Sequence, residues 1–266
     1  MSLPGNCHHD LDFGLTKGLT LSHIHSSGSS GIFPIGNILD PDTPADQARR
    51  IIEREIGYSC GPIVHVTLNH QEHGKVIVLD ELPEAHTELN CDAVIFPKGW
   101  YIAVETMLGD CPCIIIDGPE HLGFIHGGRP ELFAGIIPNF MELWPDPLEQ
   151  TKACFSPGIC GRHYELLDVS AVAGTSLAEY VCETVWGTQG YDLVSAYREE
   201  FKKGGIVPFW GDSQVCCPFC ERIDHIGQGY ATDFASDQFF RVKKMDPHKR
   251  PFSPRDCAFL HYEPKT

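Results

Sequence analysis

Long hydrophobic runs are missing from this chain of 266 residues, and so is any excess of basic side chains. No apolar stretch approaches the roughly 18 residues of a membrane-spanning helix, so we expect no membrane partner. Lys and Arg number 20 against 36 Asp and Glu, which gives a formal net charge of −16. Because a field of that sign repels phosphate backbones, we expect no nucleic-acid partner.

The sequence also lacks the marks of disorder and of secretion. It has no low-complexity tract, and its 42% of hydrophobic residues can bury a full core. No basic leader with an apolar stretch opens the chain, so we expect a cytoplasmic protein. In that reducing compartment the 12 cysteines predict free thiols, metal ligands or a nucleophile rather than disulfides.

Short apolar runs bounded by Gly, Pro, Asn or Asp predict strands, and helical spacing predicts helices between and after them. The expected strands are Ile63–Leu68, Val76–Leu79, Asp92–Phe96, Tyr101–Met107, Ile114–Asp117 and Leu122–Ile125. The expected helices are Thr43–Ile56, Pro130–Trp144, Ser176–Trp186 and Tyr191–Lys203. No linker or repeat divides the chain, so we predict one α+β domain spanning residues 1–266.

Reactive side chains gather at the ends of the predicted strands. His70 and His73 follow the first strand, Asp110 and Cys111 lie between two others, and His126 closes the last. Two imidazoles and a thiolate make a three-ligand set for Zn²⁺ that leaves a fourth position open. Their separations match no short zinc-finger spacing, so three unrelated residues at the sheet edge remain the alternative.

Ordered motifs extend this pattern over most of the chain. They are Gln71-Glu72-His73-Gly74, Thr106 to Pro112, His126-Gly127-Gly128, Pro157-Gly158-Ile159 with Tyr164-Glu165, Cys216, Phe239-Phe240 with Lys243-Lys244, and Arg250. Together they resemble the signatures of the YfiH family, the laccase-domain proteins. Members of that family are described as polyphenol oxidases and as purine nucleoside phosphorylases.

The resemblance implies a single-domain αβα sandwich, similar to the catalytic domain of cytotoxic necrotizing factor. It implies that His73, Cys111 and His126 hold zinc beside a purine nucleoside, and that a neighbouring imidazole activates Cys111. Between the two candidate histidines of the first motif the resemblance selects His73. Gln71 is then an expected substrate contact, and Asp110 is expected to orient a ligand or to transfer a proton.

The chain departs from the family where the substrate is held. The family reads His-Ala-Gly-Trp-Arg-Gly after the third ligand, whereas this chain reads His126-Gly127-Gly128-Arg129-Pro130-Glu131. The Pro biases Arg129 toward an extended conformation, so we expect it to bind phosphate weakly. An N-terminal family element with Arg before paired glycines is replaced by the run from Ser22 to Gly28.

The expected reaction is attack on a purine nucleoside, either phosphorolysis with phosphate as co-substrate or deamination of adenosine. Phosphate would need cationic donors, for which the candidates are Arg129, Arg162, Lys243, Lys244 and Arg250. Deamination would need a proton shuttle, for which Asp110 and Glu72 are candidates. No obligate protein partner is expected.

Three other functions stay open. A Cys111 nucleophile acting on amides and a non-catalytic zinc-stabilised binding protein are two of them. Copper-dependent phenol oxidation ranks below zinc chemistry, because only His23-Ile24-His25 has the paired His-x-His form of multicopper sites.

Two further groups of potential ligands have no assigned role. Cys216, Cys217 and Cys220 copy a redox motif without the chain length of that fold around it. On a strand, His23 and His25 would share one face, as in some metal-dependent hydrolases, although a solvated pair is the simpler interpretation. Cys7-His8-His9-Asp10 lies near the chain end, where fixed sites are uncommon.

Overall fold

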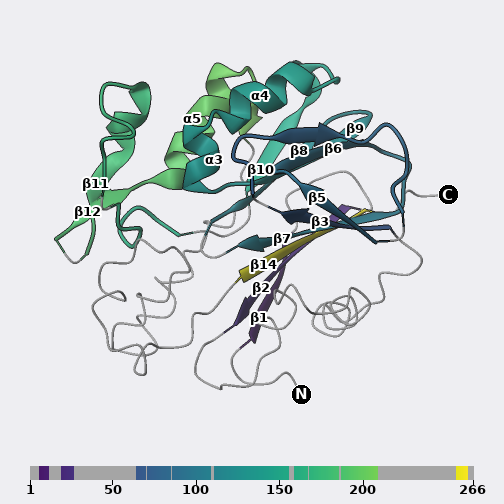
Figure 1. The fold of residues 1–266 in the computed structure, drawn as a ribbon, viewed down its shortest axis with the longest axis horizontal. Coiled ribbons are helices and arrows are strands. Elements are labelled where there is room, and N and C mark those ends of the chain that lie inside the picture. Colours follow the sequence, from purple (N-terminus) through teal and green to yellow (C-terminus); the bar gives the residue numbers. More distant parts are fainter. Residues whose placement is uncertain are drawn as a thin grey trace.

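In the described residues, two six-stranded sheets are stacked face to face, and the described helices lie on one side of the stack (Figure 1). The structure is a computed structural model that describes residues 6–11, 19–26, 64–69, 71–84, 86–108, 111–155, 159–166, 168–185, 187–208 and 256–262. The predicted helix Thr43–Ile56 lies outside these residues, as do His70, Asp110, Lys243, Lys244, Arg250 and the Cys216 to Cys220 group.

Sheet A combines strands from early, middle and late parts of the sequence, and its strand order is β1-β2-β14-β7-β3-β5. Its strands are β1 (Asn6–Leu11), β2 (Leu19–Ser26), β14 (Asp256–Tyr262), β7 (Ile102–Leu108), β3 (Val64–Asn69) and β5 (His86–Asn90). The strands from β1 to β7 pair antiparallel, whereas β3 runs parallel to both β7 and β5.

Sheet B has the order β13-β10-β8-β9-β6-β4. Its strands are β13 (Val207–Pro208), β10 (Lys152–Phe155), β8 (Cys113–Asp117), β9 (His121–His126), β6 (Ala93–Pro97) and β4 (Val76–Val78). A separate two-stranded ribbon pairs β11 (Val181–Glu183) with β12 (Gln189–Tyr191).

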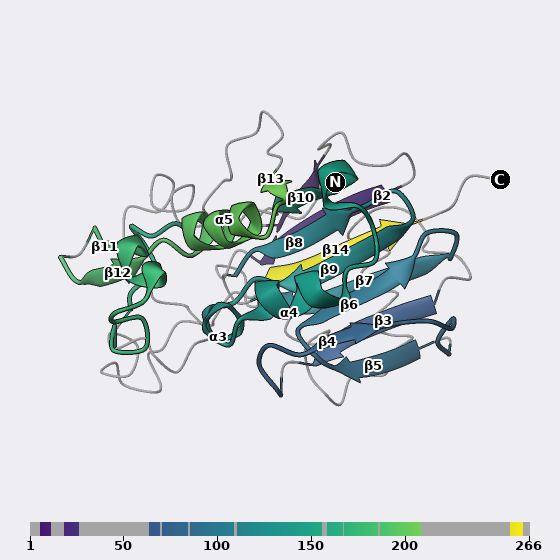
Figure 2. The ribbon, with the colours of Figure 1, turned by 90° about the horizontal axis from the view of Figure 1, so that it is seen from above.

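Among the described residues, three helices cover the face of sheet B that points away from sheet A (Figure 2). They are α3 (Arg129–Phe133), α4 (Ile136–Leu143) and α5 (Leu193–Lys203), and short 3-10 turns occupy Leu148–Gln150 and Ser176–Tyr180. Gly123 lets α4 approach β9 closely, because a Cβ at this position would collide with the ring of Phe140.

Sheet B is apolar on both faces, and alternate residues of its strands enter two different cores. Ile95, Ile114 and Ile125 pack with the helices, whereas Phe96 and Phe124 pack between the two sheets. This explains why β6, β8 and β9 read as continuous apolar runs rather than as alternating ones. Neither core is open to solvent at these positions, because all five of these side chains are fully buried.

The predicted α+β class is confirmed, and each of the six predicted strands is present within one or two residues. The β layer of the predicted sandwich consists of two sheets in the described residues. Two helix predictions need correction. Pro130–Trp144 divides into α3 and α4 at Gly135, which has a φ of 76°, and Ser176–Trp186 is a 3-10 turn followed by β11.

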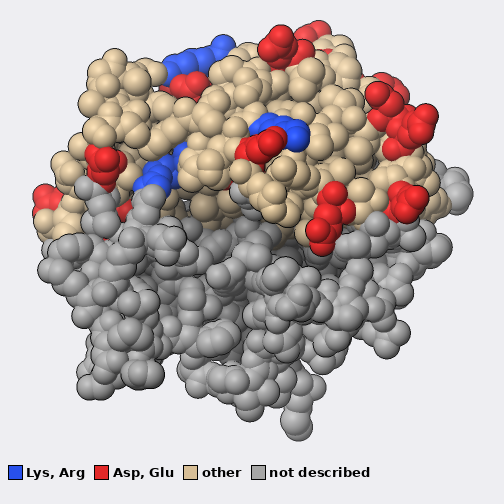
Figure 3. Space-filling model, in the orientation of Figure 1, with Lys and Arg blue, Asp and Glu red and all other residues tan. Residues whose placement is uncertain are grey.

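On the face that Figure 3 shows, acidic side chains are scattered over the described part, with fewer basic ones among them. This agrees with the net charge of −16. Within the part of the chain that the structure describes, helices are too short or too polar to span a membrane.

Candidate functional site

His73 and His126 meet at one end of sheet B, beside the start of α3. His73 lies in the turn after β3, and His126 is the last residue of β9. The β8–β9 register sets His126 opposite Cys113, and Cys111 lies two residues before this position. The three predicted ligands therefore come from three chain segments that end at the same edge.

Glu131, in the first turn of α3, contacts both predicted histidine ligands. Its Oε1 lies 3.0 Å from His73 Nδ1 and 3.5 Å from His126 Nδ1. An ionised carboxylate only accepts hydrogen bonds, so the hydrogen bond to His73 requires the proton on Nδ1 of that ring. This tautomer leaves the Nε2 lone pair of His73 available for a metal ion.

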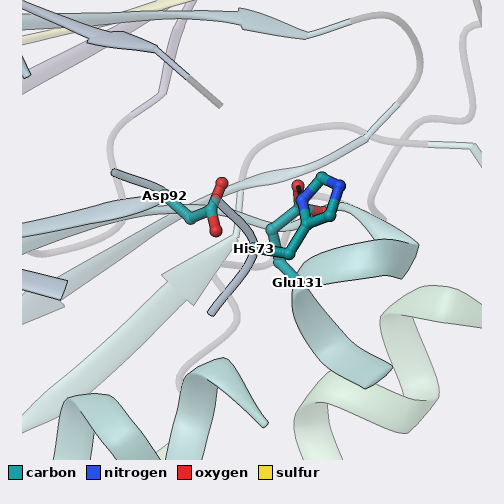
Figure 4. Close-up of side chains that lie close together, drawn as sticks. All are labelled: His73, Asp92 and Glu131. Carbon is teal, nitrogen blue, oxygen red and sulfur yellow. Dashed lines mark hydrogen bonds and ion pairs between the residues drawn. The ribbon is translucent and has the colours of Figure 1, made fainter. Parts of the chain in front are cut away.

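Asp92 fixes the backbone of the site from the start of β6. The Gly74 N–H donates to Asp92 Oδ2 at 2.6 Å, and the His126 N–H donates to the Asp92 carbonyl oxygen at 2.8 Å. His73, Asp92 and Glu131 each offer a ligand atom, and these atoms lie within 4.8 Å of one another (Figure 4). This cluster shares only His73 with the predicted ligand set, and Cys111 and His126 are not members of it.

The site is buried on one side and open on the other. Only 2% of the Glu131 side chain and 10% of His126 are exposed, but 46% of His73 is exposed. Gly128 makes room for Glu131, because a Cβ there would collide with Glu131 Oε2. A ligand can thus approach from the side of His73 while the carboxylate stays shielded from water.

Tyr197 of α5 supports the Gly128 turn from inside the helical core. Its hydroxyl donates to the Gly128 carbonyl oxygen at 2.7 Å. Complete burial raises the pKa of Tyr197 well above its usual value, and the charges of Glu131, Cys111 and Asp92 raise it further. These influences show that Cys111 and the two carboxylates act on one hydroxyl in the same small region.

Replacing Tyr197 with Phe is expected to lower the free energy of unfolding by about 0.5–1.5 kcal/mol, because the buried Gly128 carbonyl loses one of its two donors and keeps only the Leu132 N–H. Chemical denaturation with a fluorescence readout measures this change. The matched control is Tyr101→Phe, since Tyr101 is 42% exposed and its loss of a hydroxyl should be nearly neutral. Equal effects in both variants would contradict a supporting role for Tyr197.

The predicted substrate-binding residues are more dispersed. Gln71 is exposed in the turn after β3, and Arg162 is exposed in the turn that follows Cys160. Arg129 is the first residue of α3, and its charge adds a minor influence to the hydrogen bonds from Ser170 that lower the pKa of the exposed Asp168 carboxyl. Their role in binding a substrate stays a prediction.

Three residues of this region were not predicted from the sequence. Glu131 follows Pro130 in the first turn of a helix, where an acidic side chain is common for reasons of helix electrostatics alone. Asp92 resembles an ordinary strand start, and Tyr197 an ordinary apolar position of a helix. The one sign in the sequence of a special role for Glu131 is that it stands where the family has a glycine.

Residues 36–224 match the family described as multi-copper polyphenol oxidoreductase laccase, over more than half of the chain. The chain belongs to this family. The match confirms the resemblance of this laccase-domain chain to the YfiH proteins, and membership implies a metal-associated protein. No curated protein matches the sequence.

Solved structures share the fold of this laccase-domain chain at low sequence identity. Neisseria meningitidis protein NMB0706 has a TM-score of 0.64 and 18% identity, covering 96% of this chain and 99% of its own. YlmD from Geobacillus stearothermophilus has a TM-score of 0.62 and 14% identity, covering 99% and 98%. The hypothetical protein YfiH of Bacillus licheniformis has a TM-score of 0.60 and 13% identity, covering 92% and 93%.

Proposed function

We propose that this laccase-domain chain is a zinc-dependent enzyme that acts on purine nucleosides at His73, Cys111 and His126. The observation that carries the proposal is the contact of one Glu131 oxygen with Nδ1 of both histidines. Metal-ligating histidines commonly direct their second ring nitrogen to a carboxylate. A pair of unrelated histidines would not require a shared, shielded acceptor.

The donor set fits zinc. Two Nε2 atoms and one thiolate match the ligands that Zn²⁺ takes when a fourth position remains for water or substrate. In that arrangement zinc supplies Lewis acidity and a lowered pKa for water. The protein contributes orientation, because Glu131 fixes the His73 ring and the two hydrogen bonds to Asp92 fix the backbone at Gly74 and His126.

The charges around the site favour attack by water over attack by phosphate. Asp92 and Glu131 are the acidic members of the cluster, and a phosphate ion would be repelled by both. We therefore propose deamination of adenosine, in which water adds at C6 of the purine, the C6–N bond breaks, and inosine and ammonia leave.

A nucleoside panel with metal analysis tests the proposal. The purified chain is incubated with adenosine, inosine and guanosine, each with and without phosphate, and the products are separated by chromatography. Inosine formed from adenosine without phosphate supports deamination, whereas free base formed only with phosphate replaces it by phosphorolysis. Copper in place of zinc, oxidation of a phenol, or tight nucleoside retention without turnover would overturn the proposal.

Arg129→Ala is expected to leave nucleoside turnover and zinc content nearly unchanged, because the proposed reaction uses no phosphate. Steady-state kinetics with adenosine at several phosphate concentrations checks this. If Arg129 instead holds an anion, its removal should cost about 1.5–3 kcal/mol, or roughly one to two decades in phosphate affinity. A steep loss of phosphate-dependent activity with intact zinc would contradict the expectation.

Glu131→Gln is expected to weaken zinc binding about tenfold, at the lower end of the range for residues that orient metal ligands. The amide keeps the shape of the side chain but loses the charge that favours Nδ1 protonation in both rings. Competition with a chromophoric chelator measures the affinity. Glu142→Gln is the control, since Glu142 is exposed on α4. Wild-type affinity in Glu131→Gln would remove the orienting role.

A further inference from the structure

A thiol and an imidazole meet outside the candidate metal site, in a turn that follows β10 in the chain. Cys160 Sγ lies 3.2 Å from His163 Nδ1. The backbone closes this turn, because the N–H groups of His163 and Tyr164 both donate to the Cys160 carbonyl oxygen, at 2.9 and 3.1 Å. His163 is buried, whereas Cys160 is partly exposed. The imidazole is therefore held in place while the thiol can be reached from solvent.

The two-stranded ribbon brings a second thiol to the same turn. Cys182, in β11, donates its S–H to the Gly161 carbonyl oxygen at 3.3 Å. Two glycines permit this close approach. A Cβ on Gly161 would lie 2.8 Å from Cys182 Sγ, and a Cβ on Gly190 would collide with the Gly161 carbonyl oxygen. Cys182 thus lies against the residue that follows Cys160.

The chain after the turn is fixed to the other strand of the ribbon. The Leu166 N–H donates to the Gln189 carbonyl oxygen at 2.9 Å, and the Tyr191 N–H donates to the Tyr164 carbonyl oxygen at 3.0 Å. The ribbon lies beyond the stacked sheets, at the left of both views (Figure 1 and Figure 2). These bonds keep the turn and the ribbon, and with them the two thiols, in one place.

The two thiols differ in their surroundings. Burial above all raises the pKa of Cys182, and the charges of Asp192 and Cys160 raise it further. The Cys182 thiol faces a carbonyl oxygen, which cannot take its proton, whereas Cys160 faces an imidazole nitrogen, which can. Because a thiolate reacts with oxidants far faster than a thiol, Cys160 is the residue that reacts first.

We propose that Cys160 is a peroxide-reactive thiol and that Cys182 captures its oxidised form as a disulfide. First, His163 takes the thiol proton, the Cys160 sulfur attacks a peroxide oxygen, and the O–O bond breaks. The hydroxide that leaves takes the proton from His163 and becomes water, and Cys160 becomes a sulfenic acid.

In the second step the Cys182 sulfur attacks the Cys160 sulfur and the S–O bond of the sulfenic acid breaks. The hydroxide leaves with the Cys182 proton as a second water. Two electrons have then passed from the two thiols to peroxide. The disulfide fastens the turn to β11, and it shares no residue with the set His73, Cys111 and His126, so the inference does not depend on the proposed nucleoside chemistry.

Residue-resolved oxidation of the full chain tests the proposal. The protein is treated with an equimolar amount of hydrogen peroxide and unfolded, the remaining thiols are alkylated, and tryptic peptides are identified by mass spectrometry without reduction. Cleavage after Lys152, Arg162 and Arg198 places Cys160 in residues 153–162 and Cys182 in residues 163–198. These two peptides should be linked. Alkylated Cys182 throughout would overturn the proposal.

Cys154 is an internal control, because it lies in the same tryptic peptide as Cys160. It is buried between the sheets, and burial above all raises the pKa of its thiol to about 12. Cys154 should stay reduced at the peroxide dose that oxidises Cys160. A linkage that runs through Cys154 would overturn the assignment of Cys160.

Single variants separate the two steps. In Cys182→Ser, dimedone, which labels sulfenic acids, should mark Cys160, because no thiol remains to capture the sulfenic acid. In Cys160→Ser, Cys182 should stay reduced at the same dose. Oxidation of Cys182 in Cys160→Ser, or an unmarked Cys160 in Cys182→Ser, would overturn the order of the two steps.

His163→Asn should slow alkylation of Cys160 by iodoacetamide at pH 7 roughly tenfold, since an ordinary thiol is only a few per cent thiolate there. A pH profile of this alkylation in the wild type guards against a variant that fails to fold. The other charged or titratable groups of this corner are Asp192, Cys182 and the exposed Arg162. The midpoint should lie below about pH 7.5, and one at about 8.5 or above would overturn the role of His163.

Discussion

Cys111→Ser is expected to weaken zinc binding at the proposed catalytic site by more than about a hundredfold, and nucleoside turnover should fall with it. Loss of an orienting residue alone costs 10–100-fold in metal affinity as an order of magnitude, so loss of a direct thiolate ligand should cost more. A serine hydroxyl stays protonated at neutral pH and replaces the thiolate poorly. Chelator competition and adenosine kinetics on the same preparation measure both losses.

Cys154→Ala provides the control for removal of a thiol. Cys154 is buried between the two sheets, where burial above all raises the pKa of its thiol to about 12. Such a thiol is a core residue rather than a ligand, so this variant should keep its zinc and its activity. Full metal content in Cys111→Ser would show that Cys111 is no ligand and would remove the proposed catalytic site.

Phe140→Ala is expected to lower the free energy of unfolding by about 3–5 kcal/mol, the usual cost of deleting a buried aromatic ring. Phe140 is fully buried, stacks on Trp144 at a centroid distance of 5.3 Å and fills the space above Gly123. The melting temperature should fall by roughly 6–20 °C, at about 2–4 °C per kcal/mol for a protein of this size class. Differential scanning calorimetry measures the shift.

Leu143→Ala tests whether this loss reflects burial rather than helix α4 itself. Leu143 lies on the same helix but is 45% exposed. Its truncation should change the free energy of unfolding by no more than about 0.5 kcal/mol. If Leu143→Ala lowered the free energy of unfolding as much as Phe140→Ala does, the packing of the Phe140 ring against β9 would not be what holds α4 in place.

The strands that were predicted are those that can be recognised from their own apolar sequence, without knowledge of the strands they pair with. β6, β8 and β9 are buried on both faces and appear as apolar runs in the sequence. β5, with the sequence His-Thr-Glu-Leu-Asn, was missed because it is a polar edge strand whose pairing with β3 has no local signal. Gly135 divides the predicted helix Pro130–Trp144, although the apolar spacing of that segment indicates one continuous helix.

The candidate site was predictable only in part, for a related reason. His73, Cys111 and His126 follow or precede strands, where loops carry reactive side chains, and the family resemblance selects them. Glu131 joins two histidines that lie 58 and 5 residues away in sequence, which no local pattern encodes.

Sheet B supplies residues to two cores, and this has a consequence for cooperativity. Ile114 and Ile116 contact the helical side while Cys113 and Ile115 contact sheet A, so neither core can lose its packing while β8 stays in place for the other. The helical layer and the sheet layer should therefore melt together as one unit. In Phe140→Ala, amide exchange should accelerate equally in α5 and in β7, whose Ile102 and Val104 belong to the core between the sheets.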